Sequence, residues 1–551
     1  MSARIYRREQ GSWKLLSFPR RSFNMPESLN VASSSRSDIE SQQHHHHREH
    51  HSALLQDGKD PSLPANHPVN SLSAMRKFFI LCTLSYSGFL ANFGIAIIQV
   101  AFPTLGAAFG VEPSMIPNTI GYYLLGFAVG PLFWNPLSKT IGRRPVYLLG
   151  SALYIPCVIW MALSPSYECF SVSRLFSGLT SSFSQTVPPA TIADIFIKEV
   201  RGHKMSMYAV AVVIAPAVAP LFSGIIVAKT NWHVLFWLVL GLAGVQCLLY
   251  FFIVPETLWN EDFSTPLQDT DAQPIAPSPE PSESYNKDDS SKPVIRHIEE
   301  AHEGPTVVPG HVGPAWMPWQ RPMEYLHVCL SPFLMLRYIS IVIPSIYYGS
   351  LFAWSIGITI VMPQKFEKAP YSFATIPLGT AFLAYGLGGI LGKWSGGLVG
   401  DKTCSYLERK YGYRQPEHRL WALVPILPLM FVGLIIVGIV ASKELHWIGF
   451  LIGGGLFFFC LSAATGLLQT YVLEGYMSRS MDTQAVFIFF KSIWGFVIPF
   501  FVWDWGADHG FLEEYAAQGA LATGIGAILC AVFIWKGYEI RKWQGMPISP
   551  R

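Results

Sequence analysis

Twelve separate apolar stretches, each long enough to cross a lipid bilayer as a helix, constrain this chain more than any other feature. A bilayer core needs about 20 apolar residues per helix, because backbone groups without partners are not tolerated in hydrocarbon. Only 14% of the 551 residues are charged, against about 25% in an ordinary soluble domain. The pattern therefore predicts an all-α membrane protein. The net charge of +3 gives no reason to expect nucleic acid as a partner.

The apolar stretches form two sets of six, which predict two pseudo-symmetric six-helix bundles. The first set is 78–101, 116–137, 146–163, 170–195, 205–228 and 234–254, and the second is 339–361, 376–398, 420–441, 447–473, 485–503 and 516–535. The expected domains are a disordered tail over 1–77, a bundle over 78–254, a mostly disordered loop over 255–335, a bundle over 336–536 and a tail over 537–551.

The distribution of Lys and Arg over the short loops predicts the orientation. One side carries fifteen of them and the other carries four, namely Lys229, Lys365, Lys368 and Lys443. We therefore expect both termini and the central loop in the cytoplasm. A basic cluster follows the second stretch of each half, at 142–144 and at 409–412, which favours a parallel repeat of the kind found in two-domain carriers.

Polar residues within the stretches are the candidates for a substrate or coupling site, because they are costly in a membrane. Two of the stretches carry a polar stripe at helical spacing. These stripes are Arg174, Gly178, Ser181 and Gln185 in the fourth stretch, and Ser85, Asn92 and Gln99 in the first. They could join helices to one another, but two of them favour a polar path between the halves. Glu474 and Lys491 are further candidates, with interfacial side chains that reach water as the alternative.

The fifth stretch combines two prolines with small residues. Pro216 and Pro220 each remove a backbone donor and bend the helix, and Gly224 follows one turn later. Four glycines recur at four-residue spacing from Gly388 to Gly400 in and after the eighth stretch. Small residues let helices approach closely. Generic packing explains this pattern, and so does sliding between two conformations.

Histidine and cysteine give no reason to expect a metal or a cofactor. Six histidines lie between His44 and His51, and the fragment HxxHH there superficially matches an iron-binding box of membrane desaturases. Such enzymes need several boxes, and no second histidine cluster occurs in the sequence. A low-complexity tail is the preferred interpretation. The eight cysteines are scattered singly, which is typical of small buried residues.

Several segments together resemble the major facilitator superfamily, specifically its fungal branch of twelve-spanning drug:proton antiporters. Residues 130–145 (GPLFWNPLSKTIGRRP) are similar to the signature after the second helix, residues 174–178 (RLFSG) to the conserved-arginine motif, and residues 215–224 (APAVAPLFSG) to the antiporter motif. The resemblance covers about 78–543 and implies the major facilitator fold. On its motifs it implies gating roles for Gly130, Asn135, Lys139, Gly142, Arg143, Arg144, Asp194, Arg201, Pro216, Pro220 and Gly224.

Two departures from the family pattern affect the contact between the halves. Lys139 stands where the family has Asp, and Asn135 where it has Gly. The family's Asp holds the halves together, partly by facing a helix N-terminus, which would repel a lysine. We therefore expect a rebuilt contact through Asp194 or Glu199, and we expect Lys139→Asp to be tolerated. The first stretch has no acidic residue, so Glu474 is the candidate proton carrier.

The resemblance implies secondary active transport of a small organic molecule by alternating access. The preferred hypothesis is proton-coupled efflux of a drug-like compound or secondary metabolite. Import of organic cations or polyamines is the alternative, and a non-transporting membrane sensor is a further one. No HExxH motif, paired catalytic carboxylates or nucleophile elbow favours an enzyme. The expected partners are the substrate, the bilayer and protons, with the chain as a monomer in the plasma membrane or, alternatively, the vacuolar membrane.

Overall fold

The computed structural model describes residues 6–9, 12–15, 63, 67–261, 310–313, 318–412, 415–476 and 479–545. It divides into two units, Met1–Lys59 and Asp60–Arg551. In the first unit, strands β1 (Tyr6–Glu9) and β2 (Ser12–Leu15) pair antiparallel, with Tyr6 opposite Leu15. The histidine cluster, Arg414, most of the expected N-terminal tail, residues 546–551 of the expected C-terminal tail, and residues 262–309 and 314–317 of the expected loop lie outside the described residues.

The second unit consists almost entirely of helices. Its first half contains α2 (Pro68–Ser71), α3 (Ala74–Ala96), α4 (Phe102–Phe109), the 3-10 helix η1 (Pro113–Met115), α5 (Asn118–Val129), α6 (Pro131–Thr140), α7 (Arg143–Ala162), α8 (Tyr167–Ser181), α9 (Phe183–Ile195), α10 (Lys198–Lys229) and α11 (His233–Ile253).

The second half repeats this arrangement of long helices. It contains α13 (Ile339–Phe366), α14 (Thr375–Ala381), α15 (Leu383–Tyr411), η3 (Pro416–Ala422), α16 (Ile426–Lys443), α17 (Trp447–Gly475), α18 (Ser480–Val497), η5 (Ile498–Phe500), α19 (Val502–His509) and α20 (Phe511–Gln544). Between the halves, β3 (Trp259–Glu261) pairs antiparallel with β4 (Gly310–Val312), and α12 (Pro322–Leu334) leads through η2 (Met335–Arg337) into α13. The segment expected as a mostly disordered loop therefore contains a helix.

Ten helices in the described part of the chain are long and apolar enough to cross a membrane. The second and fourth expected crossings are not among these ten, and each consists of two helices, α5–α6 and α8–α9. The first break falls at Gly130, before Pro131, which has no backbone N–H to donate. The second falls at Ser182, and a Cβ atom on Gly130 would collide with the Ser182 hydroxyl. The two breaks therefore pack against each other.

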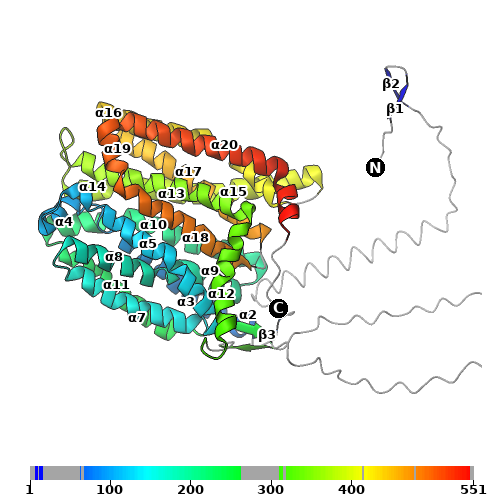
Figure 1. Ribbon diagram of the computed structural model, residues 1–551, viewed down its shortest axis with the longest axis horizontal. Coiled ribbons are helices and arrows are strands. Elements are labelled where there is room, and N and C mark those ends of the chain that lie inside the picture. The colour runs from blue at the N-terminus through cyan, green and yellow to red at the C-terminus, as the bar shows by residue number, and fades with distance from the viewer. Residues whose placement is uncertain are drawn as a thin grey trace, which may run out of the picture. The chain divides into compact units, whose positions relative to one another are not determined.

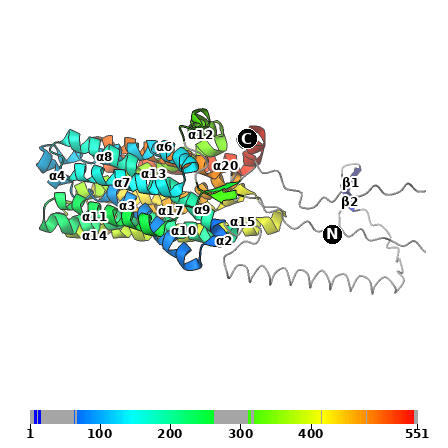
Figure 2. The same cartoon turned by 90° about the horizontal axis from the view of Figure 1, so that it is seen from below.

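The halves lie side by side with their helices nearly parallel, as Figures 1 and 2 show. Helices α5 and α10 of the first half contact α18, α14 and α15 of the second. Small residues permit the close approach. Gly121 packs against the backbone of Phe496, and Gly224 packs against that of Thr375. Gly386 packs against Ala217 of the proline-containing α10. At these three positions the halves approach each other closely through small residues.

The two ends of the bundle differ in charge. We call the end that carries Lys139, Arg143, Arg419 and Arg541 the basic end. Figure 1 shows α12 and β3 at this end, and α4, α14 and α19 at the opposite, far end. Helix α12 contacts α6 and α18, and Met323, Leu326 and Phe333 expose apolar side chains along it. Large exposed apolar residues also cover the outer helices, for example Leu248, Phe252, Ile528 and Trp535, as expected for a surface in contact with lipid.

Candidate functional site

At the basic end, an ion pair joins the two halves of the chain. Lys139, near the end of α6, places Nζ 2.5 Å from Oδ1 of Asp482 in the first turn of α18. The Asp482 side chain is 6% exposed and that of Lys139 is 29% exposed. Asn135, one turn before Lys139, donates to the backbone carbonyl of Met481 at 3.5 Å. The carboxylate stabilises the positive N-terminus of α18 and neutralises the lysine at the same time.

This pair corrects the expectation that Asp194 or Glu199 would replace the family's contact. Asp194 instead pairs with Arg143 within the first half, at 3.2 Å, and the side chain of Glu199 lies outside the described part. This geometry also argues against the expectation that Lys139→Asp would be tolerated. A carboxylate at position 139 would face the carboxylate of Asp482, and like charges repel.

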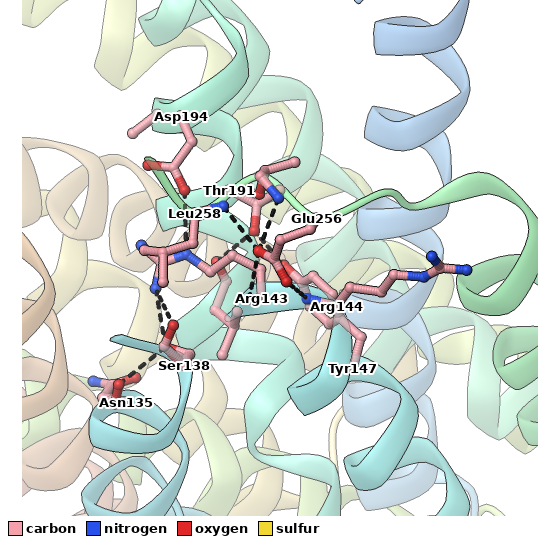
Figure 3. Close-up of polar contacts among 12 residues, drawn as sticks. Asn135, Ser138, Arg143, Arg144, Tyr147, Thr191, Asp194, Glu256 and Leu258 are labelled. Atoms are coloured by element: carbon pink, nitrogen blue, oxygen red, sulfur yellow. Dashed lines mark hydrogen bonds and ion pairs between the residues drawn. The ribbon is translucent and has the colours of Figure 1, made fainter. Parts of the chain in front are cut away.

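Arg143 connects the start of α7 to two other helices. It donates to Asp194 of α9 and, through Nη1, to the Ser138 hydroxyl of α6 at 3.0 Å (Figure 3). Only 5% of Arg143 is exposed. Arg201 supports the same region, because its Nη2 donates to the carbonyl of Ala193 at 2.7 Å near the end of α9. The basic residues of the first half therefore fix three helix ends against one another.

Glu256 caps the N-terminus of α7. Its carboxylate accepts from the backbone N–H groups of Arg143 and Arg144, at 2.9 and 3.1 Å, and from those of Thr257 and Leu258 at 2.8 Å each (Figure 3). A carboxylate there satisfies donors that the helix leaves unpaired and favours the positive end of its dipole. Gly142 has φ 108°, and a Cβ atom at this position would collide with the Glu256 carboxylate. Glycine is therefore required by both the backbone conformation and the space.

The second half carries a corresponding network around Arg419, which precedes α16 as Arg143 begins α7. Arg419 donates to both oxygens of Glu474 at the end of α17, at 2.9 and 2.7 Å, and to Asp401 of α15 at 2.9 Å. Arg541, near the end of α20, forms two hydrogen bonds with Glu417, at 2.7 and 2.8 Å. Each half thus uses an arginine before its third crossing to bind an acid at the end of its fourth.

The position of Glu474 argues against its candidacy as the proton carrier. Both of its oxygens accept from Arg419 at the basic end, so the carboxylate is already engaged in a two-bond ion pair. It corresponds in place and partner type to Asp194 of the first half. We therefore assign Glu474 to the network that fixes helix ends.

Arg174 lies completely buried within the first half, with 0% exposure. Its guanidinium donates to the carbonyls of Gly94 and Ile95 at 2.6 and 3.0 Å, and to that of Thr119 at 3.5 Å. It also lies 4.6 Å above the centre of the Tyr123 ring. Helix α3 ends at Ala96, earlier than the sequence predicts, so Arg174 binds carbonyls that the helix end leaves without partners.

The other polar candidates of the first half also point into its interior. Ser181 is hydrogen-bonded to the Tyr123 hydroxyl at 2.7 Å, and Asn92 donates to Gly88 of its own helix at 2.8 Å. Gln99 lies in a turn beyond α3, so it is not one helical stripe with Asn92. Gln185 is 8% exposed, and its Nε2 has no hydrogen-bond partner. Arg174 and Ser181 are thus brought together around Tyr123.

Four charged residues that matter here were missed or left without a partner by the sequence interpretation. Asp482 and Glu514 lie just before stretches whose ends were placed by hydropathy, so both were assigned to loops. Glu514 in α20 is 0% exposed and has one oxygen without a hydrogen-bond partner. Glu256 gave only a weak signal, an acid shortly after an apolar stretch. Lys393 of α15 lies within the glycine-rich eighth stretch, and it was not among the candidate residues.

Two six-helix bundles that pack through α5, α10, α14, α15 and α18, with an ion pair between them at one end, are the architecture of a polytopic carrier. The chain belongs to the Major Facilitator Superfamily, whose model matches residues 84–501. It is similar to the MFS-type transporter paaT of Penicillium rubens, with 27% identity over 90% of this chain and 85% of that protein.

More distant relatives and solved structures agree with this assignment. The chain is 22% identical to the MFS antiporter QDR3 of Candida albicans, over 77% of this chain and 73% of that protein. It is 21% identical to the quinidine resistance protein 3 of Saccharomyces cerevisiae, over 73% and 74% respectively. A partially occluded inward-open structure of the xylose transporter XylE from E. coli superposes with a TM-score of 0.56 at 14% identity, covering 84% of this chain and 98% of that one. This last similarity concerns the fold.

Proposed function

We propose that this transporter exports small organic molecules by alternating access, in exchange for protons. The observation that carries the proposal is the contact between the halves. It combines close backbone approach along α10 with an ion pair, Lys139–Asp482, that can break and re-form at the basic end. Surfaces of small residues offer little resistance to rocking of one bundle against the other.

The direction and the coupling ion rest on the relatives. One of them is named an antiporter and another a quinidine resistance protein, and both align with about three quarters of this chain. Export and exchange come to this chain by that similarity, and the proton as the exchanged ion comes from the resemblance of its motifs to drug:proton antiporters. We propose that the basic end faces the cytoplasm, because fifteen Lys and Arg residues lie on that side against four on the other. Both termini would then be cytoplasmic, and the plasma membrane is the proposed location.

Glu514 is the carboxylate best placed to carry the exchanged proton. It is fully buried in α20, and Gln518 donates to one of its oxygens at 2.7 Å. No cation of the described residues forms an ion pair with it. A buried carboxylate without a cation can bind and release a proton as its exposure changes. Glu514→Gln is therefore expected to permit substrate binding but to remove the dependence of export on the proton gradient.

The experiment that tests the proposed function begins in yeast cells that lack their own major drug exporters. The full chain should lower the intracellular level of at least one compound from a panel of organic acids, neutral aromatic compounds and organic cations. In proteoliposomes, transport of that compound should follow an imposed pH gradient and stop when a protonophore is added. Accumulation instead of depletion would show import, and flux that persists with the protonophore would exclude proton coupling.

A further inference from the structure

Lys491 is a buried cation in the middle of the second half. It lies in α18, is 8% exposed, and its Nζ atom sits 4.4 Å above the centre of the Phe352 ring of α13. Helix α18 contacts α5 of the first half as well as α13. Lys491 thus belongs to a helix at the contact between the halves, where a transported molecule has to pass.

A second lysine approaches the same place from α15. A Cβ atom at Gly466 of α17 would lie 3.9 Å from the Nζ atom of Lys393. Gly389, one turn before Lys393, packs against Val213 of α10 in the first half, so this face of α15 is turned toward the contact between the halves. Helix α17 also contacts α18, because Gln469, less than one turn after Gly466, donates to Gln484 of α18 at 3.0 Å.

No carboxylate of the described residues forms an ion pair with either lysine. Asp482, nine residues before Lys491, is about 13 Å away along the helix and binds Lys139. Asp401, eight residues after Lys393 and about 12 Å away along its helix, binds Arg419. Lys491 is buried and Lys393 is half-buried, and cations in such places are costly unless an anion compensates them.

The surroundings of the two lysines suit a molecule with an apolar body. Tyr348 of α13 stacks on Phe487 of α18 with ring centres 4.5 Å apart, and it also contacts Phe352. Gln484 lies two helical turns before Lys491 and accepts from Gln469 at 3.0 Å. Aromatic walls with a few convergent polar groups are typical of small-molecule sites.

We infer that Lys393 and Lys491 bind the carboxylate of an amphipathic organic anion, whose apolar part lies against Phe352, Tyr348 and Phe487. The inference rests on the proposed transport function and names the class of substrate. It opposes the alternative of a polyamine or another organic cation, because two lysines would repel such a molecule. The negative charge of the bound molecule neutralises both lysines. A neutral molecule of the same shape should therefore bind more weakly.

The test is a binding measurement that needs neither a gradient nor a transport direction. The purified full-length protein is dialysed to equilibrium against radiolabelled 2-naphthoate, with 2-naphthamide and 2-naphthylmethylamine as neutral and cationic competitors of the same shape. We expect 2-naphthoate to bind at least about tenfold more tightly than either competitor. Lys393→Met and Lys491→Met should each weaken naphthoate binding about tenfold, the loss of one charge-assisted hydrogen bond.

Matched variants separate this effect from a loss of folding. Lys365→Met is the control, because Lys365 also lies over a phenyl ring, that of Phe511 at 4.5 Å, but at the far end. It should leave naphthoate binding unchanged. Replacing a buried charge by methionine should not lower the midpoint of thermal unfolding, and the double variant Lys393→Met/Lys491→Met should still bind the neutral amide.

The inference is overturned if the amide or the amine binds as tightly as 2-naphthoate, or if the two lysine variants bind naphthoate like the unmodified protein. Export of other compounds from yeast cells would then still support the proposed function. Naphthoate binding that depends on both lysines, in a protein that exports no compound, would overturn the proposed function and retain the anion site.

Discussion

The Nζ atom of Lys139 lies 2.5 Å from Oδ1 of Asp482, a residue 343 positions further along the chain. The pair connects the end of α6 with the first turn of α18, so it joins the two bundles at the basic end. The family pattern that the sequence resembles has Asp at the position of Lys139, whereas here the acidic residue of the contact is Asp482 in the other half. The proposed rocking of the bundles requires this ion pair to separate.

The first prediction concerns the need for opposite charges at positions 139 and 482. Lys139→Asp should impair transport, because it places two carboxylates opposite each other, and Asp482→Lys should impair it as well. The exchanged double variant should recover much of the activity, with a coupling energy of about 1 kcal/mol or more. Initial rates of export in proteoliposomes measure both effects. Lys402→Asp, a charge reversal at an exposed lysine of the same end, is the control. Equal losses in the single and double variants would contradict the pairing.

The second prediction concerns Arg174, which fixes the end of α3. Arg174→Ala leaves the carbonyls of Gly94 and Ile95 without partners in a buried place, so it should cost about 3 kcal/mol of stability and abolish transport. Arg174→Lys should recover part of the stability. Thermal unfolding of the purified variants measures this. Arg337→Ala, an exposed arginine over the Tyr338 ring, should unfold like the unmodified protein. A variant without Arg174 that is fully stable but inactive would assign this residue to the substrate path instead.

The third prediction concerns the helix cap formed by Glu256. Glu256→Ala removes the acceptor of four backbone N–H groups and should lower the free energy of unfolding by about 2 kcal/mol. Glu256→Gln keeps one acceptor oxygen but no charge. Its free energy of unfolding should lie between those of the unmodified protein and Glu256→Ala. Chemical or thermal unfolding gives the values, with the exposed Glu112→Ala as the matched control. A loss no larger than that of the control would mean that the cap contributes nothing to stability.

The fourth prediction concerns Glu367, the residue directly after α13 at the far end. Burial raises the pKa of this carboxyl to about 7, against the opposing effect of Lys368. The folded protein therefore binds a proton here that the unfolded chain releases above pH of about 4.5. Stability contributed by this group should fall as pH rises from about 4.5 to 7. Glu367→Gln should remove this part of the pH dependence. The unfolding midpoints of the unmodified protein and of Glu367→Gln are measured over this pH range. If both change with pH in the same way, the raised pKa of Glu367 is contradicted.

The sequence predicted the elements that lipid dictates. Runs of about 20 apolar residues predict membrane crossings directly. The helical fold, with two sets of six crossings, followed from these runs. The breaks at Gly130 and Ser182 were not predicted, because they depend on close contact between α5–α6 and α8–α9. Helix ends were also displaced. Hydropathy marks the lipid-facing part of a helix, so acids in a first turn, such as Asp482 and Glu514, were assigned to loops.

The partners of the site residues could be predicted only where the partner is local in the chain. Nothing in the sequence around Lys139 indicates Asp482, because the contact crosses the two halves. Arg174 was correctly selected as a costly residue inside the membrane, but its partners are backbone carbonyls, which no sequence pattern distinguishes. Glu474 was selected by the same argument, and its assignment changed only when Arg419 was seen to occupy both of its oxygens.

The most direct test of alternating access is to join the bundles reversibly at the basic end. Lys139→Cys/Asp482→Cys is treated with a short bifunctional methanethiosulfonate reagent, and export of a transported compound is measured before and after reduction. The single variants, which retain the eight native cysteines, are the controls. We predict that the cross-linked protein stops exporting and that reduction with dithiothreitol restores the rate. Undiminished export by the cross-linked protein would contradict rocking of the two bundles as the transport mechanism.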